Sequence, residues 1–163
     1  MLSRIESTIM AIKKTLLNDE IVKKLIFNDS NNALQLSSPT IDEVDEYITE
    51  YPIFDFEIGG NNEKNGMINI YVIDGYPDKE NLAIDATLQV NVVFNKDKWK
   101  LVDNKIRPLE LADRVISLLN NKKFTTSNPL VFSRMQQLIL NKKLVGYALL
   151  FDIADGSSEL KNF

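Results

Sequence analysis

The fold is decided by the stretch Ile84-Asp85-Ala86-Thr87-Leu88-Gln89-Val90-Asn91-Val92-Val93-Phe94. Every even position is apolar, and every odd position except Val93 is polar. A period of two over this length predicts a strand of an antiparallel sheet, with one face on the core and the other toward water. The polar face carries Asp85, Thr87, Gln89 and Asn91, which suit solvent, a lumen or a neighbouring subunit better than a reaction centre.

Further strands are predicted on both sides of this stretch. Alternation over 53–58 ends at Gly59-Gly60, and the polar segment 61–66 connects to a returning strand over 67–74. Gly75 to Asn81 is predicted to be a loop, because it contains Pro77. After a turn at 95–98, residues 99–102 form a short strand, and the apolar stretches 130–140 and 144–154 form a hairpin around Asn141-Lys142-Lys143.

Helices are predicted before and after these strands. Apolar residues spaced by three and four predict a helix over 2–17, and a second, short one over 20–27 follows Asn18-Asp19. Thr40 and Glu43 form a capping box before a third short helix that includes Ile48 and ends before Pro52. Pro108 starts the clearest helix, which Asn120-Asn121 ends.

Together these elements predict an α+β fold. We expect one antiparallel or mixed sheet of four to six strands, with the N-terminal and the late amphipathic helix packed on one face. The expected core residues are Ile5, Ile9, Ile12, Leu88, Val90, Val92, Val115, Ile116 and Leu119. A chain of 163 residues without repeats or linkers fits a single domain over 1–154, followed by a flexible tail over 155–163.

Composition limits the possible functions. The net charge of -4 and the pI of about 4.9 argue against tight nucleic-acid binding, which normally needs a basic face. The lysine pairs, such as Lys13-Lys14 and Lys122-Lys123, are scattered and suit solvated helix ends or hairpin tips. The apolar runs are shorter than the roughly 18 residues of a membrane span, and residues 1–15 lack the pattern of a signal peptide. We expect a protein of the cytoplasm, or of a particle assembled there, without a membrane partner.

The chain contains neither histidine nor cysteine. Histidine is the commonest general base and metal ligand, and thiolates are the other common ligands of zinc. Hydrolases of the Ser/His/Asp and Cys/His types and nearly all zinc enzymes are therefore excluded. We expect no enzymatic activity, no cofactor and no metal site.

One pattern offers a catalytic alternative. Asp85 followed by Asp103-Asn104-Lys105 resembles the acid…acid-x-Lys arrangement of metal-dependent nucleases, in which two carboxylates hold a metal and the lysine polarises the attacking water or phosphate. A turn between a strand and a helix is also expected at Asp103-Asn104-Lys105, and it explains these residues more simply. The Gly59-Gly60 pair has no surrounding phosphate-binding motif and is expected to close a strand.

Six residues are candidates for a subunit or partner interface. Thr87, Gln89 and Asn91 lie on the polar face of the long strand. Trp99 follows that strand by a tight turn and is expected over the core or at a subunit contact. Arg107 and Arg114, two of only four arginines, flank the last helix as possible interface anchors or as part of an exposed helix face.

The order of elements resembles a known family. Over 2–154 the chain begins with an N-terminal amphipathic helix, followed by Asn/Asp-rich loops and strands and then by the long alternating strand. A tryptophan turn comes next, and then the helix that begins Arg107-Pro108-Leu109-Glu110-Leu111-Ala112-Asp113-Arg114. An apolar hairpin is the last element. This order is similar to that of the tail terminator, or tail completion, proteins of the neck of tailed bacteriophages.

The resemblance implies a structural virion protein with a mixed sheet and helices on one face. It implies a hexameric ring that caps the tail tube and joins it to the neck and connector proteins, with DNA passing through the lumen without specific binding. The expected location is the phage tail or neck, assembled in the host cytoplasm. The two short helices between Glu20 and Glu50 exceed what a minimal terminator needs and leave a head–tail adaptor or stopper role open. A small binding or inhibitor protein and a magnesium-dependent nuclease are the remaining alternatives.

Overall fold

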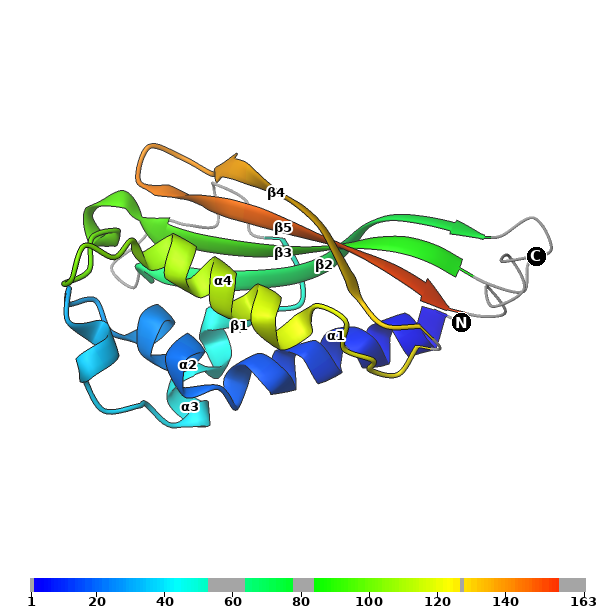
Figure 1. Cartoon of the computed structure of the whole chain (residues 1–163), viewed down its shortest axis with the longest axis horizontal. Helices are drawn as coiled ribbons and strands as arrows, with labels where there is room; N and C mark the ends of the chain where they lie inside the picture. The colour runs from blue at the N-terminus through cyan, green and yellow to red at the C-terminus, as the bar shows by residue number, and fades with distance from the viewer. Residues whose placement is uncertain (1, 53–63, 78–83, 127, 156–163) are drawn as a thin grey trace.

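The chain forms a mixed five-stranded sheet with helices against one face. The structure is a computed structural model that describes residues 2–52, 64–77, 84–126 and 128–155. The α-helices are α1 (Leu2–Leu17), α2 (Glu20–Phe27), α3 (Ile41–Val44) and α4 (Arg107–Leu119). The strands are β1 (Ile48–Thr49), β2 (Gly66–Pro77), β3 (Ile84–Asn95), β4 (Val131–Ile139) and β5 (Leu144–Asp155), and short 3₁₀ helices are η1 (Ala33–Gln35), η2 (Asp45–Tyr47) and η4 (Lys96–Lys98). The predicted α+β fold is confirmed (Figure 1).

Strand β3, the long alternating stretch, lies at the centre of the sheet. The strand order is β1-β2-β3-β5-β4, and β3 pairs antiparallel with β2 on one side and with β5 on the other. β5, the last strand of the chain, lies between β3 and β4 and is paired on both sides, so β4 forms the edge of the sheet. The far ends of β2 and β3 extend beyond the helices (Figure 1).

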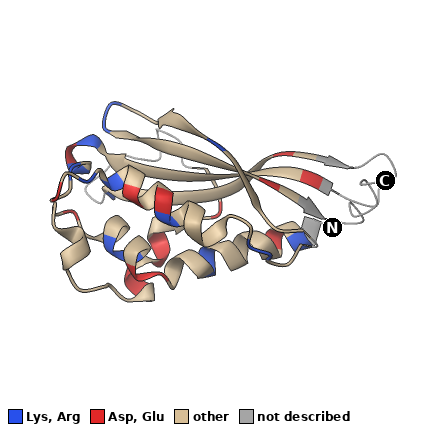
Figure 2. Cartoon of the chain, viewed as in Figure 1, with Lys and Arg blue, Asp and Glu red and all other residues tan. Residues whose placement is uncertain are grey.

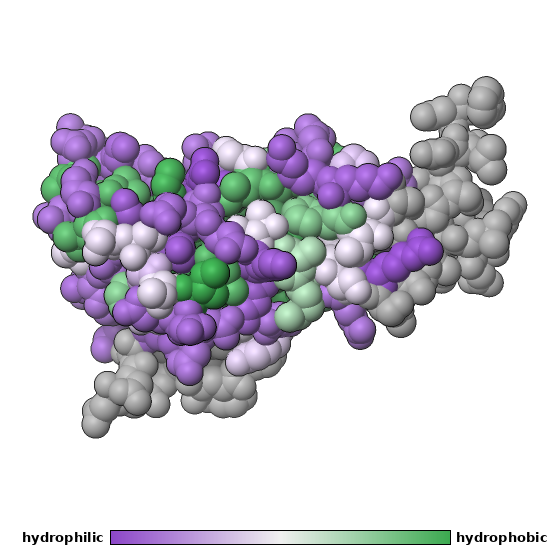
Figure 3. Space-filling model, turned by 90° about the horizontal axis from the view of Figure 1, so that it is seen from below, coloured by the Kyte–Doolittle hydropathy of each residue, from purple (hydrophilic) through white to green (hydrophobic). Residues whose placement is uncertain are grey.

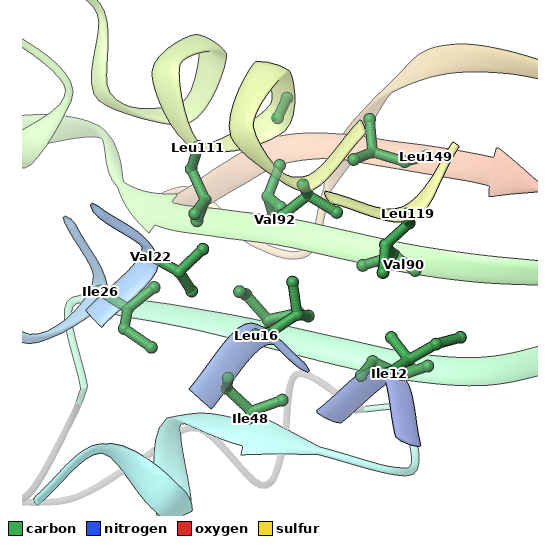
Figure 4. Close-up of a cluster of buried hydrophobic side chains, with 14 of the residues drawn as sticks. Ile12, Leu16, Val22, Ile26, Ile48, Val90, Val92, Leu111, Leu119 and Leu149 are labelled. Carbon is green, nitrogen blue, oxygen red and sulfur yellow. The ribbon is translucent and has the colours of Figure 1, made fainter. Parts of the chain in front are cut away.

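The apolar face of β3 forms the floor of the main core. Val90 and Val92 point at the helices, where Leu16 of α1 and Leu111 and Leu119 of α4 meet them (Figure 4). Seven of the nine predicted core residues are buried, and Ile9 and Ile116 are partly buried against the same cluster. The apolar faces predicted from the three-and-four spacing in the helices and from the two-residue spacing in β3 therefore pack against each other in the core.

The N-terminal half is held to the sheet through α1 and the short edge strand β1. Ile48, which was expected in the third helix, belongs instead to β1 and pairs parallel with Ile68 of β2. The ammonium group of Lys13 on α1 lies 2.8 Å from a carboxylate oxygen of Glu50 and 3.5 Å from one of Asp45. Burial alone would lower the pKa of Lys13, but these two carboxylates outweigh it and raise the pKa.

Two further local predictions were wrong. The segment 75–77, expected to be a loop, continues β2, because a β-bulge between Val72 and Asp74 lets the strand bend and stay paired with β3. The segment 99–102 is not a regular strand, since its only bridge is Lys100 with Ile106. The expected turn is confirmed, because Asp103 (φ 62°) and Asn104 (φ 59°) are both left-handed, as the central residues of a type I′ turn require.

Some of the remaining sequence predictions are confirmed, and others concern residues that the structure does not describe. The predicted ranges of α1 and α2 and the capping box of Thr40 with Glu43 are confirmed. The predicted strand over 53–58, Gly59-Gly60 and residues 61–63 of the first hairpin lie outside the described residues. Asp155, expected in the flexible tail, belongs instead to β5, and residues 156–163 lie outside the described residues.

The close pairing of β5 with β3 depends on a glycine. A Cβ atom on Gly146 would lie 1.9 Å from the carbonyl oxygen of Val92, which is backbone and cannot move aside. We expect Gly146→Ala to lower the free energy of unfolding by about 2 kcal/mol or more, as overpacking does in cores. Urea titration followed by circular dichroism measures this change.

The matched control is Gly75→Ala in β2. A Cβ atom there meets nothing closer than 3.9 Å, so this variant should unfold within about 0.5 kcal/mol of the wild-type chain. Equal stability of the two variants would contradict the role given to Gly146.

Candidate assembly surface

The face of the sheet opposite the helices is only partly open to solvent. Asp85 is exposed and Thr87 is half-buried, but Gln89 and Asn91 are 9% and 2% exposed. The expectation that this whole face points toward water is therefore wrong at Gln89 and Asn91. Val93, the apolar exception in the alternation, is buried in a second cluster with Met67 and Leu144.

The two buried amides satisfy each other and a tyrosine of the neighbouring strand. Gln89 Nε2 donates to Asn91 Oδ1 at 2.7 Å and to the hydroxyl oxygen of Tyr71 at 2.9 Å. Asn91 Nδ2 donates to the same hydroxyl oxygen at 3.0 Å. Buried amides without partners would cost free energy, so this network stabilises the pairing of β2 with β3 on the side of the bulge that contains Tyr71. Gln89 and Asn91 thus have an internal role, and their proposed interface role stays a prediction.

Thr87 lies among carboxylates at the far end of the sheet. Its cross-strand partners are Asp74 on β2 and Asp152 on β5, and Asp85 precedes it on the same face. These three aspartates are exposed. A surface pocket of about 480 Å³ lies beside them, lined among others by Asp85, Thr87 and Asp152. The ribbon of the sheet carries red segments, which mark Asp and Glu, at this end in Figure 2. Only the strand register brings these carboxylates together. The sequence pattern therefore placed Asp85 and Thr87 on one face but could not place Asp74 and Asp152 beside them.

Strand β4 is the long edge of the sheet. It is paired with β5 on one side, and seven of its nine residues are exposed. Val131, Met135 and Ile139 are large apolar side chains that are 46%, 44% and 63% exposed. Natural edge strands are usually short or protected by charge, because their free N–H and C=O groups pair readily with another chain. β4 is therefore a candidate contact strand.

Trp99 packs over the core, one of its two expected places. Its ring lies 6.1 Å from that of Tyr147, and its indole N–H donates to the carbonyl oxygen of Phe94 at 3.4 Å. It is half-buried against the main core cluster. The monomer therefore accounts for much of its surface, and a subunit contact at Trp99 stays a prediction.

Arg107 is an internal anchor. Its side chain is 1% exposed and donates to four backbone carbonyl oxygens, those of Leu25 and Asn28 at the end of α2, Ser30 after it and Lys98 in η4, at 2.6–2.8 Å. The guanidinium also lies 5.7 Å from the ring centre of Phe94. Burial lowers the pKa of Arg107, and the charge of Asp29 acts against this. An arginine at the carbonyl end of a helix satisfies acceptors that the helix leaves unpaired.

Arg114 binds the other end of the same helix. Its guanidinium donates to both carboxylate oxygens of Asp19, from Nε at 3.2 and 3.0 Å. Asp19 is the N-cap of α2 and accepts from the backbone N–H of Val22 at 3.0 Å. Burial alone would raise the pKa of Asp19, but Arg114 and the N–H of Val22 outweigh it and lower the pKa. Neither arginine is therefore free to act as a simple surface anchor.

The residues of the nuclease alternative do not meet within one chain. Asp85 lies at the start of β3, whereas Asp103 and Lys105 follow its end. A strand rises about 3.3 Å per residue, so the length of β3 separates them by roughly 30 Å. Among the described residues, no group of three or more carboxylates is placed to hold a metal ion.

The surface seen from below is mostly hydrophilic. Its apolar groups form separate patches between polar side chains, where the atoms of described residues are visible (Figure 3). In the described part of the chain, none of the helices has the length and apolar character that a membrane crossing requires.

The fold and its surfaces define a small α+β protein whose candidate functional residues lie on strand ends and on a long sheet edge. A family model described as YomW matches residues 18–153, most of the chain, so the chain belongs to the YomW family. This family is associated with phages. No curated protein matches the chain.

Replacing Arg107 by methionine should destabilise the fold strongly. The substitution keeps much of the side-chain volume but removes the donor of four carbonyl oxygens, one buried and three part-buried. Each buried acceptor left without a donor costs about 1–3 kcal/mol. We expect Arg107→Met to lower the free energy of unfolding by about 3 kcal/mol or more in a urea titration. The same change at the exposed Arg134 should cost less than about 0.5 kcal/mol, and equal effects would contradict the anchoring role.

The ion pair of Asp19 with Arg114 should make stability depend on acid pH. The pKa of Asp19 is below the unfolded value of 3.8, so its stabilisation is present above pH 3.8 and disappears as the pH falls through the folded pKa. Asp19→Asn keeps an N-cap side chain and removes the charge. Because the Arg114 side chain is 38% exposed, we expect this variant to lose only about 0.5–1 kcal/mol at pH 7.

The measurement is chemical denaturation of both chains between pH 2 and pH 7. The stability difference between wild type and Asp19→Asn should shrink toward zero at the acid end of this range. A difference that stays constant down to pH 2 would show that the charge of Asp19 is not the source of the effect.

Proposed function

We propose that this protein is a structural component of a tailed phage particle: a tail terminator that forms a ring at the head-proximal end of the tail and joins it to the neck. Membership of a phage-associated family supports the particle as its place of action. The mixed sheet with helices on one face agrees with the architecture that the resemblance to terminators implies. The ring, its six copies and its contacts with tail tube and connector proteins are parts of this proposal.

The observation that carries the proposal is that the single chain exposes an apolar edge strand and a charged sheet end on different parts of its surface. Strand β4 is a nine-residue edge with exposed Val131, Met135 and Ile139, and one end of the sheet carries three exposed aspartates. A ring subunit needs two different surfaces that complement each other, because each subunit contacts one neighbour on each side. An exposed edge and a separate acidic end are two such different surfaces on one small chain.

The proposed role requires no catalytic step. Gln89 and Asn91 on the polar face are engaged in an internal network, and Asp85 lies far from Asp103 and Lys105. The acidic balance of the chain suits a lumen through which DNA passes without being held. We therefore propose a structural role without catalysis, and we place the protein in the virion, assembled in the host cytoplasm.

The test is the position of the protein in a phage particle. Electron cryo-microscopy of particles that carry a tagged copy should show six copies between the tail tube and the neck. Deletion of the gene should leave tails of irregular length or tails that do not join heads, because the tube end would not be capped. Copies that lie one layer nearer the head would support the adaptor or stopper role instead. Absence from particles would overturn the structural proposal.

A further inference from the structure

The two ends of the sheet carry opposite charge next to exposed apolar side chains. We define the acidic end by the exposed residues Asp74, Asp85 and Asp152 with Ile73 and Val131. We define the basic end by the lysines of the two adjoining tips, Lys96, Lys98, Lys142 and Lys143, with Ile139. The backbone N–H of Lys96 donates to the carbonyl oxygen of Lys143 at 2.8 Å, so the two tips lie side by side.

The balance of charge at each end is uneven. Lys100 and Lys105 also lie in the loop next to the basic tips, and the acids near these tips are Asp29, Asp97 and Asp103. Among the described residues, lysines therefore outnumber aspartates at this end. At the acidic end, Asp74 and Asp152 flank Thr87 on neighbouring strands. The 12 residues of β3 span this distance, roughly 36 Å at 3.3 Å per residue, so one chain cannot bring its own two ends together.

We infer that the acidic end of one copy of this chain binds the basic end of the next copy. This names the partner surface within the proposed ring and rests on the proposed function. The contact is head-to-tail, which is the type of contact that closes into a ring when each step includes a rotation. Charge orients the two copies, and the buried apolar side chains supply most of the affinity.

The pocket at the acidic end offers a place for an apolar anchor. It has a volume of about 480 Å³ and is lined by Val131 and Ile153 as well as by Asp85 and Asp152. Ile139 is the most exposed of the large apolar side chains in the described part of the chain, at 63%, and it lies just before the lysine tip. Insertion of Ile139 into the pocket places Lys142 and Lys143 near the carboxylates. An apolar side chain in a pocket with charges around it is the usual arrangement of an interface centre.

Cross-linking tests this contact directly on the full-length chain. Equal amounts of ¹⁵N-labelled and unlabelled protein are mixed at low ionic strength, treated with a carbodiimide and analysed by mass spectrometry. We expect mixed-isotope cross-links between Asp85 or Asp152 and Lys142 or Lys143, and we expect them to fall several-fold in 0.5 M NaCl because surface charges are then screened. A chain that forms no intermolecular cross-links, or forms them only between other residues, overturns the inference.

Variants with reversed charge at one end distinguish this specific contact from a general effect of net charge on association. Asp152→Lys and Lys142→Glu should each weaken self-association about tenfold, as measured by analytical ultracentrifugation. A 1:1 mixture of the two variants should recover it, because each altered end then faces an end of opposite charge. The matched controls are Asp113→Lys on α4 and Lys14→Glu on α1, both exposed and away from the ends, which should leave association unchanged. A mixture that does not recover association overturns the contact.

The outcomes also distinguish the contact from the proposed function. If the expected cross-links form but the protein is absent from the phage particle, the contact is supported and the terminator role is contradicted. If the particle contains the ring but the cross-links join other residues, the terminator role is supported and this contact is contradicted. Binding of the acidic end to a different basic protein, with no self-association, likewise overturns the inference.

Discussion

The layer of helices depends on one buried guanidinium. Arg107, at the first turn of α4, donates to four backbone carbonyls that belong to the end of α2, the loop after it and η4. Arg114, two turns later, holds Asp19 at the start of α2. The two arginines are about 10 Å apart along α4, close to the 12 Å length of an eight-residue helix, so α2 is fixed at both ends. An eight-residue helix is too short to be stable alone, and this clamp explains how it keeps its place.

Strand β3 contributes side chains to two hydrophobic clusters, one on each face of the sheet. Its even residues lie under α1 and α4, and its odd residues change along the strand from exposed Asp85 to buried Val93. The network of Tyr71, Gln89 and Asn91 lies between these extremes and joins β2 to β3 by side chains as well as by backbone. Polar residues that resemble a surface in the sequence thus stabilise the register of the sheet, while the acidic far end remains open for contact.

The candidate site could be predicted only in part. Asp85 and Thr87 were found because they belong to the long alternating strand, but Asp74 and Asp152 belong to other strands and reach Thr87 through register alone. Arg107 and Arg114 were noticed because arginine is rare in the chain. Their role was missed because all their acceptors except the carbonyl of Lys98 lie within residues 19–30, between 77 and 95 positions away. Long-range contacts of this kind leave no local pattern, so the sequence drew attention to these residues without showing what they bind.

The amino-acid sequence by itself determined the fold class, the limits of α1 and α2, the start of β3, the capping box at Thr40 and the final hairpin. These features depend on periodicity and on caps within a few residues, which local physics decides. Tertiary structure alone decided that β5 is an inner strand and β4 an edge, that Gln89 and Asn91 are buried, and that opposite charges collect at the two ends of the sheet. An alternating strand shows which residues share a face, but only the neighbours packed on that face decide whether it meets water, another strand or another molecule.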